Sequence, residues 1–432
     1  MESNFDEKVQ ERAVLVGLNA DCFTAEQTAT AESLEELEDL LETAGGFCTG
    51  KVLQNRHTPD SHSFIGEGKA QEVRMLVEAT ASTMVIFDNE LSPGNIRALE
   101  EIIGVTVLDR SALILDIFAQ RARSSAGKLQ VELAQLKYNL PRLGGQGLVL
   151  SRLGGGIGTR GPGETKLEMD RRRIRGRIHD LTEKIDKLKA QRQLHRIQRK
   201  NSRVPVAALV GYTNAGKSTI LNALAGSNEV MAEDLLFATL DPTTRLIQLD
   251  DKQEILLTDT VGFIQKLPHT LVSAFQATLE ETAEADLLIH VVDASDVNYE
   301  LQIQAVVEVL KEIGAENKPA IFVFNKADKL PVLQFPDNHV EKRMLQGREG
   351  VVISAKNPAG LEILREKIKS FFAQSNIALK LCIPYDKGHL VTRLHDVAKV
   401  EAIDYNDKGT IMELTMSVSD AEPYLKYEIK DK

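Results

Sequence analysis

Apolar and polar positions follow two different periods along most of the chain. Short apolar runs, which are typical of buried strands, occur near the start at 13–16, 47–53, 84–87 and 105–108. Apolar residues three or four positions apart predict helices at 33–41, from 66 to about 78, and from 92 onward. Because strands alternate with helices, residues 1–112 are predicted to form a small parallel α/β domain.

Residues 113–203 follow a different pattern. Residues 112–140 are predicted to be one helix that Pro141 ends, and 164–200 a long charged helix with a narrow apolar stripe. Between them, nine of the twenty residues from 144 to 163 are glycine, a composition that builds no packed core. Thin apolar seams on both helices predict an antiparallel hairpin with this loop at its tip.

Two further regions complete the predicted organisation. Residues 204–374 carry apolar strands at 206–210, 255–258, 287–293, 320–324 and 351–353, which predict a mostly parallel sheet. Residues 375–432 predict a small α+β module, to which the sequence assigns no chemistry. His290 lies inside one of the apolar strands, so we interpret it as a packed core histidine rather than a base.

Charge is distributed unevenly. The chain has a formal net charge of −11, yet residues 121–203 hold 21 Lys and Arg against 7 Asp and Glu. A basic middle in an acidic protein indicates a local contact with a polyanion, and Tyr138 is the one aromatic residue close by, which favours backbone or duplex contact over single-strand binding. The alternative is a solvated linker with a charged helix face. Residues 156–161 match the dinucleotide pattern GxGxxG, but the helix after them lacks a broad apolar face, so NAD binding is rejected.

The composition excludes several other classes of protein. No apolar run is long enough to span a membrane, and the acidic start does not resemble a secretory signal. Cys22, Cys48 and Cys382 lie far apart, which argues against a disulfide framework or a cysteine metal site. We therefore expect a cytoplasmic protein without integral membrane association.

A phosphate-binding loop occurs where an apolar strand meets a helix. The glycines let the backbone N–H groups turn toward a phosphate chain, and the helix start adds its own unpaired N–H groups. Lys217 is expected to reach the β- and γ-phosphates, and Ser218 to bind Mg²⁺. The loop comprises Gly211, Tyr212, Thr213, Asn214, Ala215, Gly216, Lys217 and Ser218.

Downstream motifs complete a GTP site in the expected order. A buried strand delivers Asp259, Thr260, Val261 and Gly262, in which Asp259 would hold Mg²⁺ through water and the Gly262 N–H would sense the γ-phosphate. A preceding threonine-rich loop would close on Mg²⁺ through Thr239, with Thr243 as the alternative; its predicted nucleotide contacts are Phe237, Ala238, Thr239, Leu240 and Asp241. Lys217, Thr239 and Gly262 are the expected catalytic residues, and Ser218 and Thr239 the expected metal ligands.

Guanine selectivity is predicted from the residues that follow the strands at 320–324 and 351–353. Asp328 would accept hydrogen bonds from guanine N1–H and N2–H₂, a donor pair that adenine lacks. Asn325 would bridge loops and Lys326 would pack along the base, next to Ala327. The backbone of Ser354, Ala355 and Lys356 would meet the guanine O6. GTP or GDP with Mg²⁺ is therefore the predicted ligand.

One position departs from the commonest hydrolytic arrangement. Many GTPases place a water-orienting glutamine after the DxxG motif, whereas this chain has Phe263. A phenyl ring makes none of the required hydrogen bonds. Intrinsic hydrolysis is therefore expected to be slow, with the missing polar group supplied by another switch residue, a conformational change or a partner.

Taken with residues 144–168, these motifs resemble the HflX family of ribosome-associated GTPases. The most specific block is GGGIGTRGPGETKLE at 154–168, followed by 211–218, 237–245 and 259–263. The resemblance implies a protein that binds the large ribosomal subunit and its rRNA rather than DNA, that splits or rescues ribosomes under stress, and whose hydrolysis the ribosome stimulates. The alternative is a GTP-dependent assembly or binding factor in which hydrolysis only times release. We expect a monomer.

Overall fold

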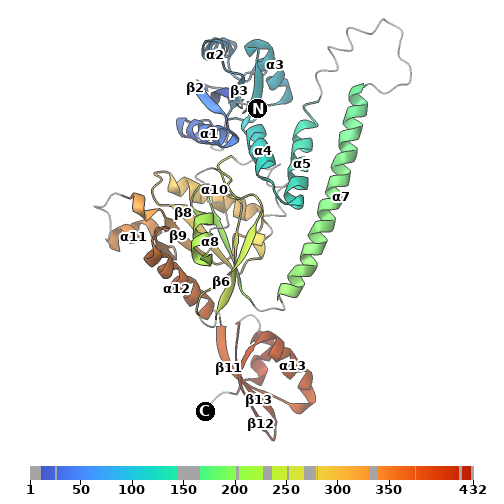
Figure 1. Ribbon diagram of the computed structural model, residues 1–432, viewed down its shortest axis with the longest axis vertical. Coiled ribbons are helices and arrows are strands. Elements are labelled where there is room, and N and C mark those ends of the chain that lie inside the picture. The colour runs from blue at the N-terminus through green and yellow to red at the C-terminus, as the bar shows by residue number, and fades with distance from the viewer. Residues whose placement is uncertain are drawn as a thin grey trace, which may run out of the picture.

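The computed structural model describes residues 11–24, 27–143, 166–200, 204–226, 236–250, 253–266, 279, 281–330, 338–374, 376–417 and 421–429. Three sheets follow one another along the long axis of the molecule (Figure 1). The predicted fold class is confirmed: a P-loop sheet is preceded by an α/β domain with a helical hairpin and followed by a small α+β module. The domain boundaries drawn at 112, 203 and 374 stay predictions.

The first sheet is parallel, with strand order β2-β1-β3-β4. Its central strand is β1, whose apolar side chains from Ala13 to Leu18 are fully buried. The Thr30 hydroxyl caps α1 by accepting from the Ser33 N–H at 3.1 Å. The turn at Gly66, just before α2, is held by a hydrogen bond from the Gly66 N–H to Gln54 Oε1 at 3.0 Å. The elements are β1 (Arg12–Ala20), α1 (Ala31–Ala44), β2 (Phe47–Arg56), α2 (Glu67–Thr80), β3 (Met84–Phe87), α3 (Pro93–Ile103) and β4 (Thr106–Asp109).

The single helix predicted over 112–140 is wrong, because the chain forms α4 (Arg110–Arg121) and α5 (Ser125–Asn139) instead. Ala122 and Ser124 have extended backbones, and the Ser124 hydroxyl caps the new helix by accepting from the Gly127 N–H at 2.9 Å. Helical periodicity continues across this break, so the apolar pattern alone does not reveal it.

The predicted helical hairpin is formed by α5 and α7 (Lys166–Lys200), which lie side by side in Figure 1. Leu133 of α5 packs against Leu181 and Ile185 of α7 in a small apolar cluster. Arg177 on α7 binds Glu132 on α5 through two hydrogen bonds of 2.7 and 2.9 Å. The glycine-rich loop predicted at the tip lies outside the described residues.

The second sheet has six strands in the order β10-β9-β8-β5-β7-β6, in which β6 alone is antiparallel to its neighbour. His290 in β8 is 2% exposed and stacks on Phe322, and burial lowers its pKa to about 3, which confirms a neutral core histidine. The elements are β5 (Val206–Gly211), α8 (Lys217–Ala225), β6 (Thr243–Gln248), β7 (Glu254–Asp259), β8 (Leu287–Asp293), α10 (Tyr299–Glu312), β9 (Ala320–Asn325), α11 (Asn338–Leu345), β10 (Gly350–Val352) and α12 (Pro358–Gln374).

The third sheet is antiparallel, with order β11-β13-β12, and has an apolar core of its own. Its elements are β11 (Asn376–Ile383), α13 (Gly388–Val397), β12 (Lys399–Asn406) and β13 (Gly409–Ser417). Across the described parts of the chain, no helix is both long and apolar enough to cross a membrane.

Candidate nucleotide-binding site

The predicted phosphate loop lies between β5 and α8, at the carboxyl edge of the second sheet, and requires two of its glycines for space. A Cβ on Gly211 would lie 2.2 Å from the Val291 carbonyl oxygen, and one on Gly216 would lie 2.2 Å from Asn325 Nδ2. The surrounding pocket is lined by Thr213, Asn214, Gly216, Lys217, Ser218, Thr219, Phe237, Ala238, Thr239, Thr260, Gly262, Asn325, Lys326, Asp328, Lys329, Ser354, Ala355 and Lys356.

Lys217 provides a buried cation at the centre of this loop. Its Nζ donates to the carbonyl oxygens of Gly211 at 3.1 Å and Tyr212 at 2.8 Å. Burial lowers the pKa of Lys217 to about 8, and the nearby Asp259 carboxylate only partly offsets this effect. A group with such weak solvation interacts strongly with a phosphate chain.

Three oxygen-bearing side chains, those of Ser218, Thr239 and Asp259, converge beside Lys217. Ser218 Oγ donates to Asp259 Oδ2 at 2.6 Å, Thr239 Oγ1 donates to the same atom at 2.9 Å, and the two hydroxyl oxygens lie 2.9 Å apart. Asp259 is fully buried, and its other oxygen, Oδ1, has no hydrogen-bond partner among the described residues. Burial raises the pKa of Asp259. Clustered hard oxygens with an unsatisfied carboxylate fit Mg²⁺.

The alternative threonine lies elsewhere. Thr243 begins β6 and pairs with Asp259 through the strand ladder, so its position belongs to the sheet. The geometry therefore favours Thr239 over Thr243 as the threonine of the candidate metal site.

The residues predicted to bind guanine meet at the far end of the pocket. Asn325 joins two loops, because its Nδ2 donates to the Ala215 carbonyl and its Oδ1 accepts from the Ala355 N–H, both at 2.9 Å. Asp328 Oδ1 accepts from Ser354 Oγ at 2.6 Å, a hydrogen bond that lowers the pKa of Asp328 and keeps it ionised. Lys326 Nζ lies 2.8 Å from Asp293 Oδ2. An ionised acceptor at this point suits the N1–H and N2–H₂ donors of guanine.

Comparison with known proteins supports this interpretation. Residues 31–119 match the family described as GTP-binding GTPase N-terminal, 121–199 the GTP-binding GTPase Middle Region, and 206–326 the 50S ribosome-binding GTPase family. GTPase HflX of Caldanaerobacter subterraneus subsp. tengcongensis is 47% identical over 93% of this chain and 90% of that protein. GTPase HflX of Escherichia coli is 42% identical over 97% and 96%. The chain belongs to the GTPase HflX family.

A crystal structure of the SsGBP and GDP complex also aligns with the chain. The two sequences are 27% identical over 84% of this chain and 99% of that one, with a TM-score of 0.47. Membership of the HflX family makes the chain a GTPase that binds guanine nucleotides.

Eight residues predicted to contact the nucleotide do not line the pocket of this HflX GTPase: Gly211, Tyr212, Ala215, Leu240, Asp241, Asp259, Val261 and Ala327. Three of them, Tyr212, Leu240 and Asp241, have side-chain partners elsewhere in the molecule. The Tyr212 hydroxyl donates to Glu36 of α1, Leu240 is buried in the apolar core, and the Asp241 carboxylate reaches the start of α5. A contiguous motif overstates the number of ligand contacts, because only some residues of a loop line the pocket. Conversely, Thr219 and Lys329 line the pocket and were not predicted.

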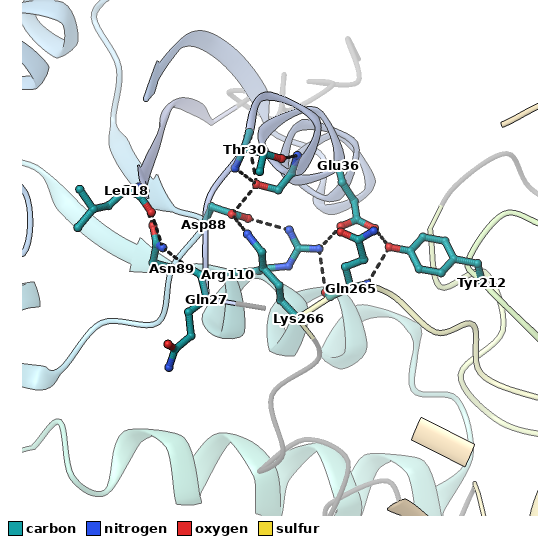
Figure 2. A network of polar contacts seen from close by, with 11 residues as sticks. Leu18, Gln27, Thr30, Glu36, Asp88, Asn89, Arg110, Tyr212, Gln265 and Lys266 are labelled. Carbon is teal, nitrogen blue, oxygen red and sulfur yellow. Dashed lines mark hydrogen bonds and ion pairs between the residues drawn. The ribbon is translucent and has the colours of Figure 1, made fainter. Parts of the chain in front are cut away.

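Tyr212 belongs to a buried polar network that joins the GTPase sheet to the first domain (Figure 2). Arg110 donates to Asp88 at 2.9 Å, to Glu36, and to the Gln265 carbonyl at 3.2 Å. The Gln265 N–H donates to the Tyr212 hydroxyl oxygen at 2.7 Å. These partners lie up to 176 residues apart and form no local motif, so the sequence contains no signal that would have revealed them.

Phe263, which replaces the usual glutamine, is 1% exposed. Its carbonyl accepts from the Thr213 N–H at 2.7 Å, and its N–H donates to the Gly211 carbonyl at 3.1 Å. The ring lies in an apolar cluster that includes α1 and α4 of the first domain as well as the GTPase sheet. Phe263 therefore anchors the segment after Gly262, and it offers no polar group to an attacking water.

Proposed function

We propose that this HflX GTPase binds the large ribosomal subunit and its rRNA in the cytoplasm, that it splits or rescues stalled ribosomes under stress, and that the ribosome stimulates its GTP hydrolysis. The family description of residues 206–326 as a 50S ribosome-binding GTPase supports the ribosomal partner. The observation that carries the proposal is Phe263, because a GTPase without a polar side chain at this position needs the missing group from another source, which we propose the ribosome provides or brings into place.

The helical hairpin supplies a surface for that partner. Arg173 and Arg175 are exposed on α7 and belong to the basic segment around the glycine-rich residues. Arginine side chains neutralise and position phosphates of a nucleic acid backbone. This arrangement supports contact with rRNA along α7.

Within the nucleotide site we propose that Ser218 and Thr239 bind Mg²⁺ directly and Asp259 does so through water. The metal ion would neutralise charge that develops on the β- and γ-phosphate oxygens. Lys217 would hold the same phosphates, and the Gly262 N–H would donate to the γ-phosphate. Asp328 and the backbone at Ser354, Ala355 and Lys356 would select guanine.

Sedimentation of intact ribosomes with purified protein tests the proposal. With GTP, or with a non-hydrolysable analogue, we expect free subunits to appear and protein to migrate with the large subunit. GTP turnover should rise on addition of large subunits. Intact ribosomes in both nucleotide states, together with protein bound to free large subunits, would instead favour the assembly or binding factor.

A further inference from the structure

Residues 236–241, which we name the switch I segment, touch three different parts of the molecule in turn. The Phe237 ring packs edge-on against Phe118 of α4, with ring centroids 4.7 Å apart. Thr239 faces Ser218 and Asp259. The Asp241 side chain turns back to the start of α5. The threonine of the candidate metal site is therefore held between two anchors on helices of the first half of the chain.

The Asp241 anchor is a set of three hydrogen bonds. Its Oδ2 accepts from the backbone N–H of Arg123 at 3.0 Å and of Ser124 at 2.7 Å, and its Oδ1 accepts from the Ser124 hydroxyl. A carboxylate at a helix N-terminus is favoured by the helix dipole, and hydrogen bonds to an ionised acceptor are stronger than neutral ones. A residue 117 positions away along the chain thus binds the junction of α4 and α5.

Two local features indicate that the backbone of both α5 and the switch I segment is adapted to this contact. A Cβ on Gly127, in the first turn of α5, would lie 2.5 Å from Asp241 Oδ1, so glycine leaves room for the carboxylate where alanine would favour the helix. Phe237 has a φ of 53°, in the left-handed region that bulky residues rarely adopt. Such a conformation persists only where surrounding packing holds it, and Phe118 provides that packing.

The helix that Asp241 binds is one arm of the helical hairpin. Because α5 is joined to α7 by the Arg177–Glu132 pair and by Leu133, a displacement of the hairpin reaches the α4–α5 junction. We propose that Asp241 is a positioning residue for GTP hydrolysis: by fastening the switch I segment to α5 it holds Thr239 at the metal site, so the hairpin controls magnesium-dependent binding of GTP. This inference rests on the proposed magnesium role of Thr239.

The test compares Asp241→Ala and Gly127→Ala with Thr239→Ala. In Asp241→Ala we expect the Mg²⁺ concentration for half-maximal GTP hydrolysis to rise about tenfold. This is the size of effect expected when charge-assisted hydrogen bonds are lost. A fluorescent non-hydrolysable GTP analogue should dissociate at nearly the same rate in Mg²⁺ and in EDTA, while GDP affinity stays unchanged. Gly127→Ala should shift in the same direction. Ser92→Ala, which removes a similar helix cap from α3, is the matched control and should behave as wild type.

The outcomes separate this inference from the function on which it rests. If Thr239→Ala loses its response to Mg²⁺ while Asp241→Ala and Gly127→Ala keep theirs, the positioning role is overturned and the metal role stands. Should Thr239→Ala also respond normally, the proposed metal role fails. Equal loss of GDP and analogue affinity in the Asp241 variant, with a lowered Tm, would show general destabilisation and would also overturn the positioning role.

Discussion

Lys217 shows how a single side chain connects burial to ligand binding. Its ammonium group has exchanged water for two carbonyl oxygens of its own loop, and desolvation is the larger influence on its pKa. Phosphate oxygens favour the charged form, so the pKa of Lys217 must rise when a nucleotide binds. Binding of nucleotide is therefore linked to uptake of a proton wherever free Lys217 is neutral.

This linkage predicts the pH dependence of affinity. With a pKa of about 8 for Lys217 in the free protein, GDP affinity should fall about tenfold between pH 7 and pH 9. Fluorescence titration of GDP between pH 6 and 9 measures the change. Lys217→Arg keeps its charge throughout this range and should bind more weakly but without the fall. The same fall in both proteins would assign it to the guanine base and contradict the prediction.

At this scale the sequence predicted most of the residues that line the pocket, because backbone geometry and hydrogen-bond chemistry constrain those positions closely. It did not predict the direction of Tyr212 and Asp241. Both lie inside recognisable motifs, yet their side chains serve Glu36 and Ser124 instead. The way the domains pack against each other determines these partners, and the local spacing of apolar residues contains no information about that packing.

Among the elements, the chain segment after Gly262 is bound to the first domain by charged side chains, because Lys266 in this segment pairs with Asp88. Asp88 is fully buried and binds Lys266, Arg110 and Ser33. Two anionic and two cationic side chains meet there: Glu36 and Asp88 with Arg110 and Lys266. Burial lowers the pKa of Lys266 more than Asp88 raises it. The positive and negative charges of this network balance only while Lys266 is present.

Replacing Lys266 with Met should therefore destabilise the protein by about 3 kcal/mol, because it leaves the carboxylates of Asp88 and Glu36 with Arg110 as their one shared counter-ion in this network. Denaturant-induced unfolding measures the loss. Lys69→Met breaks a more exposed pair with Glu72 and should cost under about 1 kcal/mol. The double variant Asp88→Asn, Lys266→Met should recover part of the loss. Equal effects of the two lysine substitutions would argue against a compensated network.

The elements also show where sequence patterns stop being informative. Strand positions at the centre of both parallel sheets were predicted closely, since continuous apolar runs have few alternatives. The break at Ala122–Ser124 was missed because apolar spacing continues through it, and the carboxylate that binds the break, Asp241, comes from a distant segment. Tertiary contacts decided this boundary.

For the whole molecule, α7 and α11 lie on opposite sides of the GTPase sheet (Figure 1), and Arg173 and Arg175 on α7 are exposed. Under the proposed function, Arg173→Glu with Arg175→Glu should lower stimulation of GTP turnover by large subunits at least about tenfold, since phosphate contacts dominate nucleic acid affinity. GTP binding should be unchanged. Lys342→Glu with Arg343→Glu on α11 is the control and should retain stimulation. Retained stimulation in the α7 variant would remove its rRNA role.

The apolar cluster that contains Phe263 has a consequence for synthesis of the protein. It joins Leu37 and Phe118 of the first domain to Phe237, Phe263 and Val306, which lie on loops and a helix around the GTPase sheet, whereas the third sheet has a separate core. In a nascent chain that has completed α4, the apolar side chains of this face stay exposed to solvent until nearly two hundred more residues have left the ribosome. We infer that the first two sheets mature as one cooperative unit late in translation, and that the emerging amino-terminal half is a client for chaperones.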